Sequence, residues 1–133
     1  QGFRVLADLA KLNIPYQNTA LLAQRKYLNS AQDSTERLLR ALSDTIGFVL
    51  DPRNKSLVLQ SIAKGLRLAR VEDAVGGYER LGNMYQRRIF PNVDGIRSTI
   101  RFLGATNEKI RALKAEDLVD ERFVRKLEQD GRF

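Results

Sequence analysis

The chain has 133 residues, a formal net charge of +7, and no cysteine or histidine. Its length suits one folded unit, and 43% hydrophobic and 29% charged residues are ordinary for a soluble globular protein. This composition excludes disulfides, the usual zinc sites and any Ser-His or Cys-His catalytic pair, and no run approaches the ~18 apolar residues of a membrane span.

Two short strands are predicted before residue 25. FRVLA (3–7) is an apolar run with a β-branched valine, and Asp8 follows it. Pro15 then favours an extended conformation for the residue before it. ALLAQ (20–24) is continuously apolar rather than alternating, which is typical of a strand buried on both faces, although Ala and Leu also allow a helix.

The most regular helical pattern covers about residues 31–50. Ser30 is the predicted N-cap, and Asp33 and Glu36 suit the positive end of the helix dipole. Pro52 stops the pattern. The side chains expected on the buried face are Leu38, Leu39, Leu42, Ile46, Val49 and Leu50.

Two further helices are predicted between Asn54 and Pro91. Asn54 is expected to cap the first of them. The second covers about residues 71–89, although its three glycines each cost roughly 1 kcal/mol relative to Ala. The apolar residues expected to face inward are Leu57, Val58, Ile62 and Leu66 in the first helix and Val75, Tyr78, Leu81 and Tyr85 in the second.

The remaining helices follow Pro91. Asn92 is expected to cap a helix, a short helical turn follows near 107–113, and Asp120 is expected to cap a last helix that ends near Gly131. The residues expected to face inward are Val93, Ile96, Ile100 and Leu103, and then Phe123, Val124 and Leu127. The predicted fold is therefore mainly α, with about five or six helices and one or two short N-terminal strands.

No residue pattern predicts catalysis or a metal site. Gly76 and Gly77 lie inside a helical pattern and lack the Lys-Ser/Thr ending of a phosphate-binding loop. The acid pairs at 72–73 and 116–117 are adjacent in sequence, so each pair does not share a helix face. We therefore expect no enzyme activity, no catalytic residue, no metal and no cofactor.

The basic residues of segment 96–111 point to an alternative function. Arg97, Arg101, Lys109 and Arg111 are positioned to meet nucleic-acid phosphates, but an apolar stripe and an intervening acid weaken this interpretation. Nucleic acid is therefore not an expected partner. A basic helical interaction or nucleic-acid-binding module stays as the alternative.

The segment 16–19 carries a tyrosine ring, two amides and a hydroxyl. These uncharged groups, on Tyr16, Gln17, Asn18 and Thr19, offer donors and acceptors that suit a small polar ligand. A polar turn before a strand explains the same residues, and the residues alone favour this simpler interpretation.

Several stretches together resemble the periplasmic solute-binding proteins of ABC importers, of the nitrate/sulfonate/taurine and thiamine-precursor type. The matching motifs are G-F-R-V-L-x-D-L (2–9), I-P-Y-Q-x-T (14–19), R-K-Y-L (25–28), F-P-N-V-D-G-I-R (90–97) and A-E-D-L-V-D-E-R-F-V-R-K-L-E-Q-D-G-R-F (115–133). The resemblance covers nearly the whole chain but only the C-terminal part of such a protein. The missing Met at residue 1 likewise leads us to expect an excised or processed piece of a longer chain, and QGFR (1–4) does not open a signal peptide.

The resemblance implies a piece of a two-lobed α/β fold of the type II periplasmic-binding class. Residues 1–24 form a strand and a lobe crossing, and residues 25–133 form a helical region of the same structural unit. Asp8, Tyr16, Gln17, Asn18 and Thr19 then lie at the cleft between the lobes, although Asn18 stands where the family often has glycine.

The implied function is capture of a small solute by hinge closure and its delivery to an ABC permease in the membrane. The implied location is periplasmic or extracytoplasmic, with a membrane anchor in the full-length form. Strands cut out of larger sheets leave unpaired edges, so we also expect a homo-oligomer through residues 3–24, which light scattering would detect.

Overall fold

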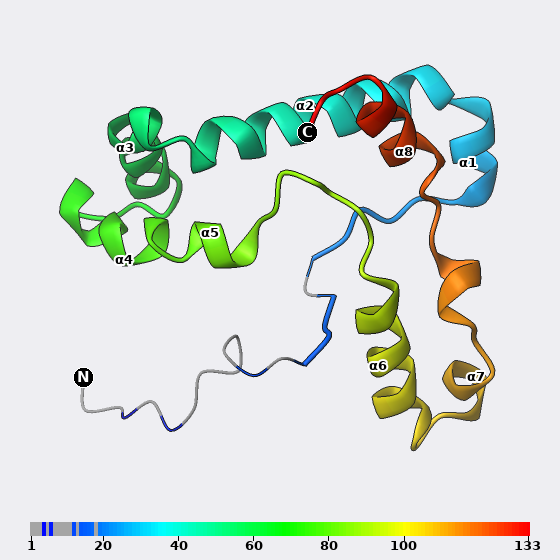
Figure 1. Ribbon diagram of the computed structural model, residues 1–133. Coiled ribbons are helices and arrows are strands. Elements are labelled where there is room, and N and C mark those ends of the chain that lie inside the picture. The colour runs from blue at the N-terminus through cyan, green and yellow to red at the C-terminus, as the bar shows by residue number, and fades with distance from the viewer. Residues whose placement is uncertain (1–3, 5, 7–11, 13, 18) are drawn as a thin grey trace. The chain divides into compact units, whose positions relative to one another are not determined.

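The computed structural model describes residues 4, 6, 12, 14–17 and 19–133, and these residues are mainly helical (Figure 1). They divide into two compact units, each built from two separate stretches of chain. Unit 1 comprises Gln1–Gln24 and Phe90–Glu121, and unit 2 comprises Arg25–Ile89 and Arg122–Phe133. Each unit is described by itself below.

The predicted strand at 20–24 is wrong, because no described residue forms a strand. These residues have no regular structure, and the side chain of Leu22 is 93% exposed. A strand needs a neighbouring strand to pair its backbone groups, and none of the described residues supplies one. The other predicted strand, at 3–7, falls mostly on residues outside those described.

The long helix predicted at 31–50 is confirmed as α2 (Gln32–Leu50), which belongs to unit 2. Ser30 is not its N-cap, because it is the last residue of a shorter helix, α1 (Arg25–Ser30), and its hydroxyl donates to the carbonyl oxygen of Tyr27. The backbone N–H of Ala31 bonds to the same carbonyl at 2.8 Å. A second helix thus starts almost directly where the first one ends.

The buried face of α2 differs from the predicted one at its start. Thr35, Ser43 and Ile46 are buried, while Leu38 is 57% exposed. The hydroxyl of Thr35 donates to the carbonyl oxygen of Ala31 at 2.9 Å, which satisfies this polar group inside the structure. The buried face of α2 is therefore rotated about the helix axis relative to the face that the leucine spacing predicted.

The helix after Asn54 is confirmed as α3 (Lys55–Gly65), which follows a 3-10 turn, η2 (Pro52–Asn54). The side chain of Asn54 does not cap α3, because its Nδ2 donates to the carbonyl oxygen of Phe48 at the end of α2. Val58 and Ala63 are buried, whereas two residues expected to face inward, Leu57 and Leu66, are exposed.

The single helix predicted over 71–89 is wrong. The segment is broken into η3 (Val71–Ala74), α4 (Val75–Tyr78) and α5 (Leu81–Met84). The glycines at 76, 77 and 82 raise the entropic cost of a continuous helix. An added Cβ at any of the three would meet no atom within 4 Å, so these glycines do not serve close packing.

The last predicted helix is confirmed as α8 (Arg122–Gln129), with Phe123, Val124 and Leu127 buried. It contacts α2 within unit 2 (Figure 1). Gly131 has φ +69°, and the N–H of Arg132 bonds to the carbonyl of Leu127, which is the C-terminal pattern that favours glycine. The buried side chains thus hold α8 in unit 2, and the hydrogen bond beside Gly131 ends the helix.

Unit 1 contains α6 (Val93–Gly104), α7 (Glu108–Arg111) and a 3-10 turn, η4 (Ala115–Leu118). Asn92 caps α6 as predicted, because its side-chain oxygen accepts from the N–H of Gly95 at 2.9 Å. Asn107 caps α7 in the same way, and α6 contacts both of the shorter elements.

Candidate functional site

The predicted ligand-binding residues fall partly outside the described part of the chain. Asp8 and Asn18 lie outside it. Of the others, Tyr16 is 63% exposed, Thr19 is exposed, and Gln17 is half-buried. The three described side chains therefore lie at the surface of unit 1.

Both ends of the Gln17 amide are used within unit 1. Its Oε1 accepts from the backbone N–H of Asn92 at 2.7 Å, and its Nε2 donates to the carbonyl oxygen of Thr19 at 2.6 Å. Asn92 is the N-cap of α6, so its own N–H has no partner within the helix. Gln17 supplies that partner from 75 residues earlier in the chain.

Gly95 lies in the first turn of α6 and lets this segment approach closely. A Cβ on Gly95 would lie 2.6 Å from the backbone N of Gln17 and 2.6 Å from the backbone C of Tyr16. Gly95 is buried. The backbone at 16–17 therefore rests directly on the start of α6, and this contact leaves the Tyr16 ring directed to solvent.

Replacing Gln17 with alanine is expected to loosen this attachment. The change removes a hydrogen bond to a helix N-terminus, which is typically worth about 1 kcal/mol. The amide proton of Asn92 should then exchange with solvent faster, as measured by NMR hydrogen exchange. Thr19→Ala is the matched control, because only the backbone oxygen of Thr19 takes part. Equal exchange in wild type and Gln17→Ala would contradict the role of Gln17.

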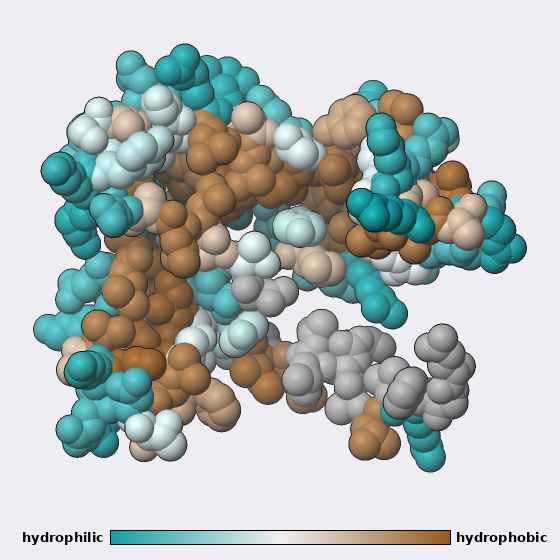
Figure 2. Space-filling model, turned by 180° about the vertical axis from the view of Figure 1, so that it is seen from behind, coloured by the Kyte–Doolittle hydropathy of each residue, from teal (hydrophilic) through white to brown (hydrophobic). Residues whose placement is uncertain are grey.

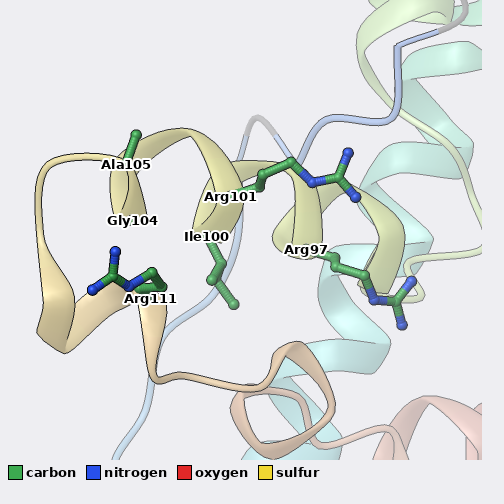
Figure 3. A pocket seen from close by; sticks show the side chains of 6 residues that line it. All are labelled: Arg97, Ile100, Arg101, Gly104, Ala105 and Arg111. Carbon is green, nitrogen blue, oxygen red and sulfur yellow. The ribbon is translucent and has the colours of Figure 1, made fainter.

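A second feature of unit 1 is a hollow between α6 and the segment that leads to α7 (Figure 3). Its volume is about 290 Å³. We call it the arginine hollow, and its lining residues are Arg97, Ile100, Arg101, Gly104, Ala105 and Arg111. Figure 3 shows the Ile100 side chain directed toward the space between the two segments, so the hollow has an apolar floor and basic ends.

The three arginines of the hollow differ in their partners. Arg97 pairs with Asp94 and with Glu116 of η4, and the hydrogen bond to Glu116 raises the pKa of Arg97. Arg111 pairs with Glu108 at 2.9 Å. Arg101 has no hydrogen bond or ion pair within the described part of the chain, and its charge is the most available of the three.

The link from Arg97 to Glu116 ties η4 to α6. The pKa of Glu116 lies below its ordinary value, first because its own backbone N–H bonds to the carboxylate and second because Arg97 donates to it. From sequence, Glu116 was considered only as one of two adjacent acids that do not share a helix face. The structure adds a tertiary ion pair, 19 residues apart in sequence, that local spacing does not reveal.

The close approach of the two walls depends on Gly104. A Cβ at that position would lie 2.9 Å from the Cα of Arg111. Gly104 is buried at the end of α6, so the chain turns tightly from α6 toward α7. The spacing of Arg97 and Arg101 signalled a basic helix surface in the sequence, but the hollow itself depends on this turn.

The described residues contain no cluster of acidic side chains arranged to hold a metal ion. Within the same part of the chain, none of the helices combines the length and the apolar character needed to cross a bilayer. Comparisons with protein-family profiles, with curated proteins and with solved structures find no match to this chain. The site must therefore be interpreted from its own residues.

Proposed function

We propose that this chain is the C-terminal portion of the extracytoplasmic substrate-binding component of an ABC transporter. The proposal rests on the resemblance of five motifs, spread over nearly the whole chain, to that family. In such a protein, two lobes close about a hinge on a small solute, and the closed form delivers the solute to a membrane permease.

One observation carries the proposal further than the motifs alone. Gln17 belongs to I-P-Y-Q-x-T, and Asn92 and Gly95 belong to F-P-N-V-D-G-I-R. These two motifs meet in unit 1 through the Gln17–Asn92 hydrogen bond and the contact on Gly95. Two motifs that were recognised separately thus depend on each other physically, as expected if they were selected within one fold.

The attachment also suggests how a lobe crossing works. A hinge segment must be fixed at one end so that motion is confined to the few residues beside it. The hydrogen bond of Gln17 fixes the segment on α6, while Tyr16 and Thr19 keep exposed side chains. We propose that these two side chains face the solute, and that Gln17 holds the segment in place rather than binding the solute.

The exposed apolar run after this segment is consistent with the same proposal. Leu21 and Leu22 are both exposed, although a continuous apolar run of this kind normally packs in a protein interior. In a two-lobed protein, a sheet built from other parts of the polypeptide would cover it.

The direct test is the gene that encodes this chain. The proposal expects the coding sequence to continue upstream into an α/β pattern of a whole lobe, preceded by a secretory signal. An upstream sequence that encodes an unrelated domain or none would overturn it. With the full protein in hand, Tyr16→Ala should reduce the thermal stabilisation produced by a bound solute, and Tyr27→Ala serves as a control on α1.

The arginine hollow favours a second candidate, a basic helical interaction or nucleic-acid-binding module. Its arginines lie on α6 and α7, the segment whose charge first suggested contact with phosphates. A gel shift with duplex DNA that weakens steeply with added salt would support this candidate. Absence of a shift at low salt would exclude nucleic acid and leave the transport proposal unaffected.

A further inference from the structure

One face of α2 carries an uncharged stripe that unit 2 leaves exposed. We call it the α2 seam, and its residues are Ser34, Leu38, Ala41, Thr45 and Phe48. All five are exposed, including Leu38 at 57% and Phe48 at 46%, and none of the buried residues of α2 belongs to the seam. Figure 2 shows apolar residues along α2 in the upper part of the view.

The spacing of the seam is that of the packing positions in a coiled coil. Its members follow one another at steps of four, three, four and three residues, which keeps them within about 80° of the helix circumference over about 21 Å. The hydroxyl of Thr45 donates to the carbonyl oxygen of Ala41 at 2.7 Å, so a partner can cover it without leaving an unpaired donor. The seam can therefore be buried against another helix at little polar cost.

Two opposite charges lie along one edge of the seam. Arg37 precedes Leu38, and Asp44 precedes Thr45, so the two charged residues are two helical turns apart. The Nε of Arg37 donates to the carbonyl oxygen of Asp33, which directs this side chain away from Asp44. Neither charge forms an ion pair within the described part of the chain. A partner is needed to supply both counter-charges.

We propose that the α2 seam binds the same seam of a second copy of this chain, with the two helices antiparallel. In this register Leu38 of each copy faces Ala41 of the other, so a large side chain meets a small one. Ser34 of each copy likewise faces Thr45 of the other. The two-fold symmetry of the pair then places Arg37 of each copy beside Asp44 of the other, which gives two ion pairs.

Other arrangements of two α2 helices satisfy fewer of these groups. A parallel pair would set Leu38 against Leu38 and Ala41 against Ala41, and would leave both edge charges without partners. Sliding an antiparallel pair by seven residues would bring the two Asp44 carboxylates together, and like charges at an interface repel. Charge complementarity thus selects one orientation and one register. The proposal uses unit 2 alone, involves a surface other than residues 3–24, and stands independently of the transport function.

The first test is analytical ultracentrifugation of the full chain over a series of concentrations, which should show a dimer that forms as concentration rises. Arg37→Glu should weaken dimerisation by about tenfold, because the symmetry turns two attractive pairs into two repulsive ones. Adding Asp44→Arg to this variant reverses both charges and should restore the wild-type affinity. Arg80→Glu makes the same charge change at another exposed position of unit 2 and should dimerise as the wild type does.

The second test determines the orientation, and the absence of native cysteine makes it simple. Under mild oxidation, a mixture of the Ser34→Cys and Thr45→Cys variants should form a disulfide-linked dimer. Either variant alone should not, because its two thiols would lie about 16 Å apart along the antiparallel pair. The altered side chains are exposed in the monomer, so circular dichroism and the melting temperature of dilute samples should match the wild type.

Three results would overturn the proposal. A chain that stays monomeric up to its solubility limit would leave the seam to another part of a longer polypeptide or to a different protein. A dimer that Arg37→Glu leaves unchanged, or that Arg80→Glu weakens equally, would assign association to another surface or to overall charge. Efficient cross-linking of Ser34→Cys with itself would indicate a parallel pair.

Discussion

Replacing Gly95 with alanine is expected to destabilise unit 1 by about 1–3 kcal/mol, the usual cost of forcing extra atoms into a packed site. Two backbone atoms, the N of Gln17 and the C of Tyr16, lie 2.6 Å from the position of the new Cβ. Backbone cannot rotate away as the end of a side chain can, so either α6 or residues 16–17 must shift. Chemical denaturation monitored by circular dichroism measures the loss.

Gly76→Ala is the matched control, with the opposite sign expected. Gly76 also lies in a helix, α4, but an added Cβ there meets nothing within 4 Å. Alanine should therefore stabilise by about 0.5–1 kcal/mol through reduced backbone entropy of the unfolded chain. If Gly95→Ala also stabilised the protein, the close contact between α6 and residues 16–17 would be disproved.

Truncation of Leu127 to alanine is expected to cost about 2–5 kcal/mol, the range for a leucine removed from a packed core. Leu127 is 1% exposed, and it lies on the face of α8 that also buries Phe123 and Val124. Its loss leaves a cavity in the contact between α8 and α2. Urea unfolding should show a lower midpoint, with little change in the slope.

Leu38→Ala on α2 is the comparison for this change. It deletes the same atoms from a side chain that is 57% exposed, so the cost should be about 0.5 kcal/mol or less. The pair separates burial from helix propensity, because both residues lie in helices. Equal costs at the two positions would contradict the assignment of α8 to the core of unit 2.

Local signals explain the elements that could be predicted from the sequence. α6 begins after an asparagine whose side chain caps it, and α8 carries apolar residues at helical spacing before a glycine with positive φ. Each of these signals acts within one or two helical turns. The same holds for α2, whose length and end before Pro52 follow from its periodicity.

The incorrect predictions involve competition between local preference and distant contacts. Residues 20–24 have the composition of a buried strand, but strand pairing requires a partner that the described residues do not supply. Leucine spacing suggested Leu38 for the buried face, whereas packing selected Thr35 and Ser43, whose hydroxyls find acceptors. In the segment 71–89, the apolar residues at helical spacing favoured one continuous helix. The entropic cost of three glycines opposed it, and the segment forms three short elements instead.

The residue types of the candidate site could be predicted from the sequence, but the contacts between those residues could not. The polar character of Tyr16 and Gln17 was evident, but the partner of Gln17 is Asn92, at a separation that no local pattern encodes. No role was assigned to Gly95 from the sequence, and only the structure reveals its close backbone contact. The arginine hollow likewise depends on a tight turn after Gly104.

The division of the chain between the two units has a consequence for folding during synthesis. Unit 2 is the first to have most of its residues made, since 25–89 precede the second stretch of unit 1, yet its last helix, α8, is made after all of unit 1. Unit 1 receives its final residues, up to Glu121, before that helix emerges. Domains generally fold as units while the chain grows, in order from the N-terminus. Here unit 2 lacks α8 until residues 122–129 are made, and α2 keeps the face that α8 will cover exposed until then.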